Sequence, residues 1–127
     1  MRSLAREAVY KYLYSKLFNP DDEGLFDVLI KELSNEDKIF ATQLKNLVIN
    51  NEARLLDTLA ELSIGYKLDR IHASDKIAIL IGMAEFDGFK QTPKIVIIDE
   101  AVKLASKYST DNSPDFVNGV LASYTKE

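Results

Sequence analysis

Two arginines and two tyrosines recur at every fourth position near the start of the chain, at Arg2, Arg6, Tyr10 and Tyr14. In an α-helix four residues turn through about 400°, so such a row stays on one side and drifts by about 40° per step. Guanidinium groups pair with phosphates, and phenol rings stack on unpaired bases, so the row favours single-stranded RNA as a ligand. The alternative is that the rings border the core and that the arginines only meet water.

Residue types that support catalysis are scarce. His72 is the single histidine and there is no cysteine, so neither a Cys–His pair nor a thiolate zinc site can form. The five glycines are scattered, which leaves no phosphate-cradling loop, and there is no calcium-binding loop of the Asp-rich type. We therefore expect a protein that is not an enzyme and that has no catalytic residue, metal or cofactor.

The charge is unevenly distributed along a chain whose formal net charge is −4. Residues 1–18 have a net charge of +3, whereas residues 20–37 have a net charge of −6. A net negative protein is not a general electrostatic binder of nucleic acid. Any RNA-binding surface should therefore be a local patch close to the first helix.

Apolar residues follow a helical period along the whole sequence. They predict an all-α bundle of about seven helices, joined by short loops and without a convincing strand. The first helix is expected over residues 2–18, and Asn50–Asn51 should separate the third helix from the fourth because asparagine favours turns. The other expected boundaries are a cap at Ser34, helix ends at Gly65 and Gly88, and helix starts at Thr92–Pro93 and Ser113–Pro114.

The chain of 127 residues fits one domain, over residues 1–127, with a sizeable core. No run of 18 apolar residues is present, so no membrane-spanning helix is expected. Arg6, Glu7 and Lys11 interrupt the apolar run that a signal peptide needs. The absence of cysteine is consistent with a cytoplasmic protein.

Two carboxylates interrupt apolar helical segments, and both are predicted to be structural. Glu100 is followed by Lys103 and Lys107, so surface ion pairs along one helix are a simple account of it. Glu85 stands between Ala84 and Phe86 and is expected to be half-buried with a backbone or tyrosine partner.

The segment Ser113–Leu121 contains two residues that fit a helix interior poorly, Asn118 and Gly119. Close packing at Gly119 and local capping by Asn118 would account for both. Asn118 is expected at the edge of the apolar stripe of this helix, and Phe116 on its opposite flank.

This segment is the most specific of four strings that resemble, in the same order, the NusB family of transcription antitermination factors. The four are Ala5–Ala8 with Leu13–Tyr14, Asp75–Ala78 with Ala84–Phe86, Pro93 with Ile98–Ala105, and Ser113–Leu121. They span nearly the whole chain.

The resemblance implies a fold, a function and partners. The fold would be two packed three-helix subdomains that share one core, with a seam near residues 66–71. The function would be RNA-binding transcription antitermination: the protein binds boxA-type single-stranded RNA together with the ribosomal protein NusE. In complex with RNA polymerase and other Nus factors, it would promote read-through of terminators, notably in rRNA operons. Family members occur as monomers and as homodimers, and a homodimer could cover the first helix.

The resemblance and the row at the start of the chain together assign contact residues. The RNA-binding residues are expected to be Arg2, Arg6, Tyr10, Lys11, Tyr14, Phe116 and Asn118. The NusE-binding residues are expected to be Asp75, Lys76 and Asn112. The family's arginine-rich string is reduced here, because Ser3 and Leu4 stand in its middle, which implies fewer phosphate contacts and weaker RNA affinity.

Two further functions stay open. One is a NusB-type helical module for protein–protein interaction with weak or no RNA binding. The other is the NusB-type domain that accompanies an RNA methyltransferase, although we expect no methyltransferase domain here.

Overall fold

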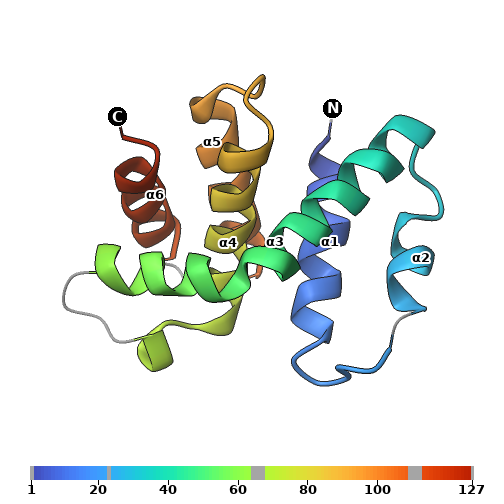
Figure 1. The fold of residues 1–127 in the computed structure, drawn as a ribbon, viewed down its shortest axis with the longest axis horizontal. Helices are drawn as coiled ribbons and strands as arrows, with labels where there is room; N and C mark the ends of the chain where they lie inside the picture. The colour runs from blue at the N-terminus through green and yellow to red at the C-terminus, as the bar shows by residue number, and fades with distance from the viewer. Residues whose placement is uncertain (1, 23, 64–67, 109–112, 127) are drawn as a thin grey trace.

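All regular structure in the described part of the chain is helical, which confirms the predicted all-α class. The computed structural model describes residues 2–22, 24–63, 68–108 and 113–126. The elements within these ranges are α1 (Ser3–Ser15), α2 (Leu25–Ile30), α3 (Asn35–Leu62), the 3₁₀ turn η1 (Leu68–Arg70), α4 (Ala73–Gly88), α5 (Lys94–Tyr108) and α6 (Ser113–Tyr124) (Figure 1). None of these helices has both the length and the apolar character that a membrane crossing needs.

The helices form two groups of three around a shared core. α1 packs on α2 and α3, whereas α4, α5 and α6 pack on one another. α3, coloured cyan to green, runs from beside α2 across the molecule to α4 and α6 (Figure 1). One cluster of buried apolar side chains includes residues of both groups. A division at residues 66–71 stays a prediction, because residues 66 and 67 lie outside the described ranges.

The predicted break at Asn50–Asn51 is wrong, because α3 continues through it as one helix. The side-chain Nδ2 of Asn51 donates a hydrogen bond to the carbonyl oxygen of Leu47, at 2.8 Å. Buried side chains also recur on both sides of this point, at Leu44, Val48, Leu55 and Leu59. A spacing of eleven residues is about three helical turns, so these four lie on one face. Burial of this face outweighs the low helix propensity of asparagine.

Two helix ends show how local hydrogen bonds set the boundaries. Ser34 caps α3 as predicted, since its Oγ accepts a hydrogen bond from the backbone N–H of Asp37, at 3.1 Å. α1 ends at Ser15, three residues earlier than predicted, where the hydroxyl of Ser15 donates to the carbonyl of Tyr12, at 2.7 Å. The end predicted at Gly65 lies outside the described residues.

Gly82 allows α4 and α6 to approach closely. A Cβ atom at this position would lie 2.8 Å from Cδ1 of Leu121, a side chain that is fully buried. At Gly119, in contrast, an added Cβ would meet nothing within 4 Å. The predicted close packing at Gly119 is therefore wrong. The crowded glycines lie on α4 instead, at Gly82 against Leu121 and at Gly88 against Leu47.

Gly82 and Gly119 predict opposite effects of the same substitution. Gly119→Ala should stabilise the protein by about 0.5–1 kcal/mol, because alanine is the better helix former and the space is open. Gly82→Ala should be less stable than Gly119→Ala by about 1–3 kcal/mol, because overpacking against Leu121 offsets the gain in helix propensity. Urea unfolding followed by circular dichroism measures both values. Equal stabilities of the two variants would show that the Leu121 side chain can shift to accommodate the added methyl group without loss of stability.

Candidate nucleic-acid interface

Arg6 lies in a buried cluster of charges. Its Nε and Nη2 donate to the two carboxylate oxygens of Glu85 on α4, at 2.7 and 2.6 Å. Its Nη1 donates to Oε1 of Glu100 on α5, at 3.2 Å. Arg6 is only 5% exposed. A phosphate could therefore reach this guanidinium only by displacing the carboxylates, so the RNA contact of Arg6 stays a prediction that would require this exchange.

This cluster explains both carboxylates within apolar segments. Glu85 is 1% exposed and Glu100 is 8% exposed, so both are structural, as predicted. Their partner differs from the prediction: Glu85 pairs with Arg6 rather than with a backbone group or a tyrosine. Glu100 does bond Lys103, at 3.3 Å, but it is buried and pairs with Arg6 as well. The sequence holds no local signal for these pairs, because the partners are far apart along the chain.

Arg6 and Glu100 stabilise each other's ionised forms. Burial would lower the pKa of Arg6, but its hydrogen bonds to Glu85 and the charges of both glutamates outweigh burial and raise it. Burial would likewise raise the pKa of Glu100, yet hydrogen bonds from Ser3 and Lys103 and the charge of Arg6 lower it. Salt bridges from Arg6 to Glu85 and Glu100 therefore join α1 to α4 and α5.

Tyr10 faces the interior too, so its predicted stacking on RNA, which stays a prediction, would require the ring to leave the core. Tyr10 is 2% exposed, and its hydroxyl donates to the carbonyl oxygen of Ser74, at 3.1 Å. Burial, with the nearby Tyr14 and Asp75, raises the pKa of Tyr10 to about 12. Its ring stacks with Tyr14 and with Tyr108 on α5, at centroid distances of 6.3 and 4.9 Å.

The exposed members of the predicted set on α1 are Arg2, Lys11 and Tyr14. Tyr14 is 40% exposed. The guanidinium carbon of Arg2 lies 4.4 Å from the centroid of the Phe40 ring, which positions this cation against the start of α3. The row at every fourth position is thus divided: its two outer members reach solvent and its two inner members are buried.

Glu7 joins α1 to the end of α5. Its Oε2 accepts a hydrogen bond from Nζ of Lys107, at 2.6 Å, and another from the hydroxyl of Tyr108. Burial would raise the pKa of Glu7, but these two hydrogen bonds outweigh it and lower the pKa below its usual range. Tyr108 stands at helical spacing from the buried Leu104 and Ala105, yet it is 37% exposed.

Asp75 lies under the start of α6 and is 5% exposed. Its Oδ2 accepts a hydrogen bond from the hydroxyl of Ser113, at 2.9 Å, whereas its Oδ1 has no hydrogen-bond partner among the described residues. The contact of Asp75 with NusE stays a prediction that would require this carboxylate to become exposed, and in the structure its bond to Ser113 positions α6. Lys76 is half-buried, and Asn112 lies outside the described residues.

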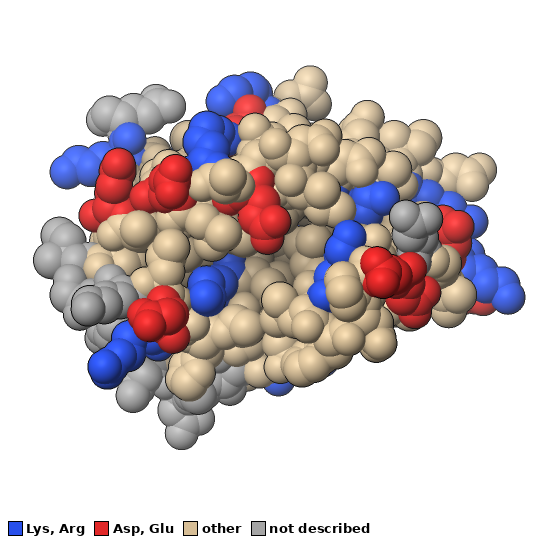
Figure 2. Space-filling view, turned by 60° about the horizontal axis from the view of Figure 1, so that its bottom comes forward, with Lys and Arg blue, Asp and Glu red and all other residues tan. Residues whose placement is uncertain are grey.

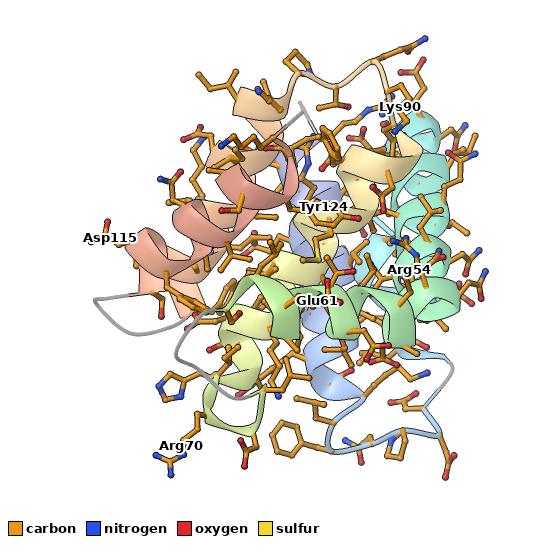
Figure 3. All side chains as sticks on the ribbon, turned by 60° about the vertical axis from the view of Figure 1, so that its left-hand side comes forward. Arg54, Glu61, Arg70, Lys90, Asp115 and Tyr124 are labelled. Carbon is orange, nitrogen blue, oxygen red and sulfur yellow. The ribbon has the colours of Figure 1, made fainter. Side chains whose placement is uncertain are left out.

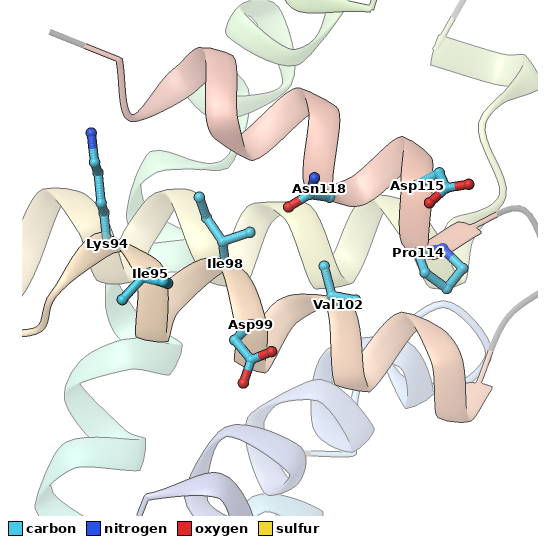
Figure 4. Close-up of a pocket in the computed structure, with 8 residues that line it drawn as sticks. All are labelled: Lys94, Ile95, Ile98, Asp99, Val102, Pro114, Asp115 and Asn118. Atoms are coloured by element: carbon cyan, nitrogen blue, oxygen red, sulfur yellow. The ribbon is translucent and has the colours of Figure 1, made fainter.

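Asn118 is exposed on α6 and lines a groove between α5 and α6 (Figure 4). The groove has a volume of about 490 Å³. Its other lining residues are Lys94, Ile95, Ile98, Asp99, Val102, Pro114 and Asp115. Phe116 is half-buried and packs against the core, so it does not share this site with Asn118.

On one face of the molecule, charges are mixed rather than gathered by sign. Figure 2 shows one face on which acidic and basic side chains are interspersed around an uncharged area.

A polar cluster joins α3, α4 and α6. Nη2 of Arg54 and the hydroxyl of Tyr124 both donate to Oδ2 of Asp87, at 3.0 and 2.6 Å (Figure 3). This cluster gives Tyr124 a structural role. Within the described residues, no group of three or more histidine or acidic side chains could hold a metal ion.

A family model described as the NusB family matches residues 1–126. The chain belongs to the NusB family. Membership confirms the resemblance of the four strings, and it rests on relatives that match along nearly their full length.

Two NusB relatives illustrate this match. The transcription antitermination protein NusB of Kineococcus radiotolerans is 35% identical over 93% of this chain and 90% of that protein. The protein of the same name from Campylobacter lari is 32% identical over 99% of this chain and 96% of its own length.

The NusB fold is equally clear from solved structures. The structure of T. maritima NusB is 27% identical, has a TM-score of 0.93, and is matched over 100% of this chain and 92% of that chain. A structure of antitermination factors NusB and NusE in complex with dsRNA has a TM-score of 0.85 at 22% identity, covering 98% and 95% of the two chains. This second likeness concerns the fold alone.

Removal of the buried cation should be costly. Arg6→Met should destabilise the protein by about 3–5 kcal/mol, because it leaves two buried carboxylates without their common partner. Lys11→Met, an exposed position on the same helix, should change stability by less than about 0.5 kcal/mol. Urea unfolding at neutral pH measures both.

The same experiment includes a variant without the buried charges. Arg6→Met combined with Glu85→Leu and Glu100→Leu should be more stable than Arg6→Met alone, because no unpaired carboxylate remains. If Arg6→Met were as stable as the wild type, the cluster would not hold α1 in place.

Glu7 should give stability a dependence on acid pH. Its pKa is lowered in the folded protein, so its contacts stabilise the fold above the unfolded-state pKa of about 4.3 and are lost as the pH falls through the folded value. Urea unfolding of the wild type and of Glu7→Gln should therefore differ most at pH 7 and converge near pH 3. Glu61→Gln, an exposed site on α3 (Figure 3), controls for loss of a surface carboxylate. A constant difference between wild type and Glu7→Gln would contradict this account.

Proposed function

We propose that this protein is a cytoplasmic transcription antitermination factor that binds boxA-type single-stranded RNA together with NusE. It acts on the elongation complex of RNA polymerase and other Nus factors, notably in rRNA operons, and it is not an enzyme. The observation that carries this proposal is the match to the NusB family over residues 1–126, with near-complete coverage of proteins named for antitermination.

Exposed groups on α1 and α6 support RNA binding by a small surface. Arg2 and Lys11 supply cations for phosphates, Tyr14 supplies a ring for an unpaired base, and Asn118 supplies an amide. Arg6 acts on this surface as a positioning residue, because it holds α1 against α4 and α5. With so few cations, the affinity for RNA should depend only weakly on salt concentration.

The partner surface would lie where α4 and α6 begin. Asp75 and Ser113 join these two helix starts, and Lys76 follows directly on α4. The structure of NusB and NusE with dsRNA supports NusE as the protein partner. Asp75 would contribute by orienting α6, and Asn112 and Lys76 by contact.

A helical module for protein interaction without RNA binding is the second candidate. The burial of Arg6 and Tyr10 favours it, because two of the residues predicted to contact RNA point inward. The formal net charge of −4 favours it too, since it opposes binding of a polyanion.

A titration of RNA separates the two candidates. A fluorescently labelled boxA-type RNA should bind more tightly than a scrambled RNA, and addition of NusE should strengthen the preference. Arg2→Gln should weaken binding to both RNAs alike, because a phosphate contact carries no sequence information. Lys90 is exposed beyond the end of α4 (Figure 3), so Lys90→Gln serves as the control that also removes one positive charge. If the protein showed no preference for the boxA-type RNA even with NusE present, the leading function would be excluded. The protein-interaction module would then be the remaining candidate.

A further inference from the structure

The face that α1 presents to solvent differs from the row of arginines and tyrosines. Its exposed side chains follow a spacing of three and four residues, at Leu4, Lys11 and Tyr14, with the partly buried Glu7 between them, and Phe18 lies in the turn that follows the helix. Such a spacing places them on one side of the helix. The end of α5 continues this face, because Lys107 and Tyr108 both bind Glu7.

Aromatic rings form a continuous ladder across the two helices. Tyr108 stacks with Tyr10, and Tyr10 stacks with Tyr14, with interplanar angles of 20° and 16°. The ring of Phe18 meets Tyr14 edge to face, at a centroid distance of 5.6 Å. The middle ring is buried, whereas Tyr108 is 37% exposed and Tyr14 is 40% exposed. A ladder of near-parallel rings that ends in exposed rings can be extended by the flat face of a nucleobase.

The charges around the ladder suit a polyanion. Glu7 is the acidic side chain on this face among the described residues, and Lys107 and the hydroxyl of Tyr108 engage it. Lys11 lies one turn further along α1 and is exposed. Nζ of Lys107 lies 5.5 Å from the centroid of the Tyr108 ring, and its side chain is 61% exposed. Lys107 therefore lies against the exposed ring and pairs with Glu7, while Lys11 adds a second positive charge near the same carboxylate.

Tyr108 is also held in one orientation. Its hydroxyl binds Glu7 and its ring stacks on the buried Tyr10, which is itself fixed by its hydrogen bond to Ser74. A ring fixed in advance loses little conformational freedom when a base stacks on it.

We propose that Tyr108 stacks on an unpaired base of single-stranded RNA, with Lys11 and Lys107 contacting the neighbouring phosphates. This inference rests on the proposed function and deepens it, because it moves the centre of the RNA site from Arg6 to the face shared by α1 and α5. Glu7 is a positioning residue in this site, since it orients Tyr108.

The test uses the full chain and a boxA-type RNA that carries 2-aminopurine at single positions, whose fluorescence falls when the base stacks. Tyr108→Leu should weaken RNA binding about 5- to 100-fold, the loss expected for one base–aromatic stack, and should abolish the fluorescence change at one position. Tyr108→Phe keeps the ring and should bind within about 3-fold of the wild type. Val28→Ala, on α2 and 67% exposed, is the control and should bind like the wild type.

A second measurement avoids any effect of the substitutions on folding. The wild-type protein is photocrosslinked to the same RNA carrying 4-thiouridine, and mass spectrometry should place the crosslink at Tyr108.

Two outcomes would overturn the inference while leaving RNA binding in place. One is that the wild type binds RNA, Tyr108→Leu binds equally well, and no crosslink forms at Tyr108. The other is that Tyr108→Leu loses capture of NusE in the absence of RNA but still binds RNA, which would make the ladder a protein surface. If the wild type bound no RNA even with NusE present, the proposed function would fail together with this inference.

Discussion

The contact on which the α1 surface depends is the buried pairing of Arg6 with Glu85 and Glu100. An ionised guanidinium inside a protein is tolerated only when carboxylates satisfy it, and here one cation satisfies acceptors on two other helices. Because side chains along a helix are separated by about 100°, turning Arg6 inward decides which residues of α1 face solvent. Lys11 and Tyr14 are exposed for this reason, and Tyr10 is buried for the same one. The charge cluster thus sets the chemistry of a surface to which it does not itself contribute.

The remaining contacts of the site follow from how the helices meet around α4. Gly82 lets α6 approach, and the bond between Asp75 and Ser113 fixes where α6 begins. Tyr10 reaches the same region, since its hydroxyl binds the carbonyl of Ser74. The start of α4 is therefore bonded both to Tyr10 of α1 and to the start of α6.

Much of the fold could be predicted from the sequence, because helical periodicity and capping are local. The pattern around Ser34 and the helix start at Ser113 are examples, and the order of the four family strings supplied the fold as a whole. The break at Asn50–Asn51 was predicted wrongly, because propensity favours a turn there and only tertiary burial decides for a helix.

The site was harder to predict. The row from Arg2 to Tyr14 has the composition of an RNA-binding surface, but whether Arg6 meets phosphate or carboxylate depends on residues far along the chain. Tyr108 was missed as a surface residue for the same reason: its periodicity matches the apolar face, and its exposure depends on how α5 ends against α1.

The length of α3 has a consequence for how the molecule comes apart. Its first half packs with α1, its second half reaches α4 and α6, and no break divides them (Figure 1). Melting of either group of helices would strip partners from a helix that the other group also needs. The two groups should therefore lose their structure in one cooperative transition, with no stable half-molecule. Amide hydrogens along the middle of α3 would then exchange with solvent only through global unfolding.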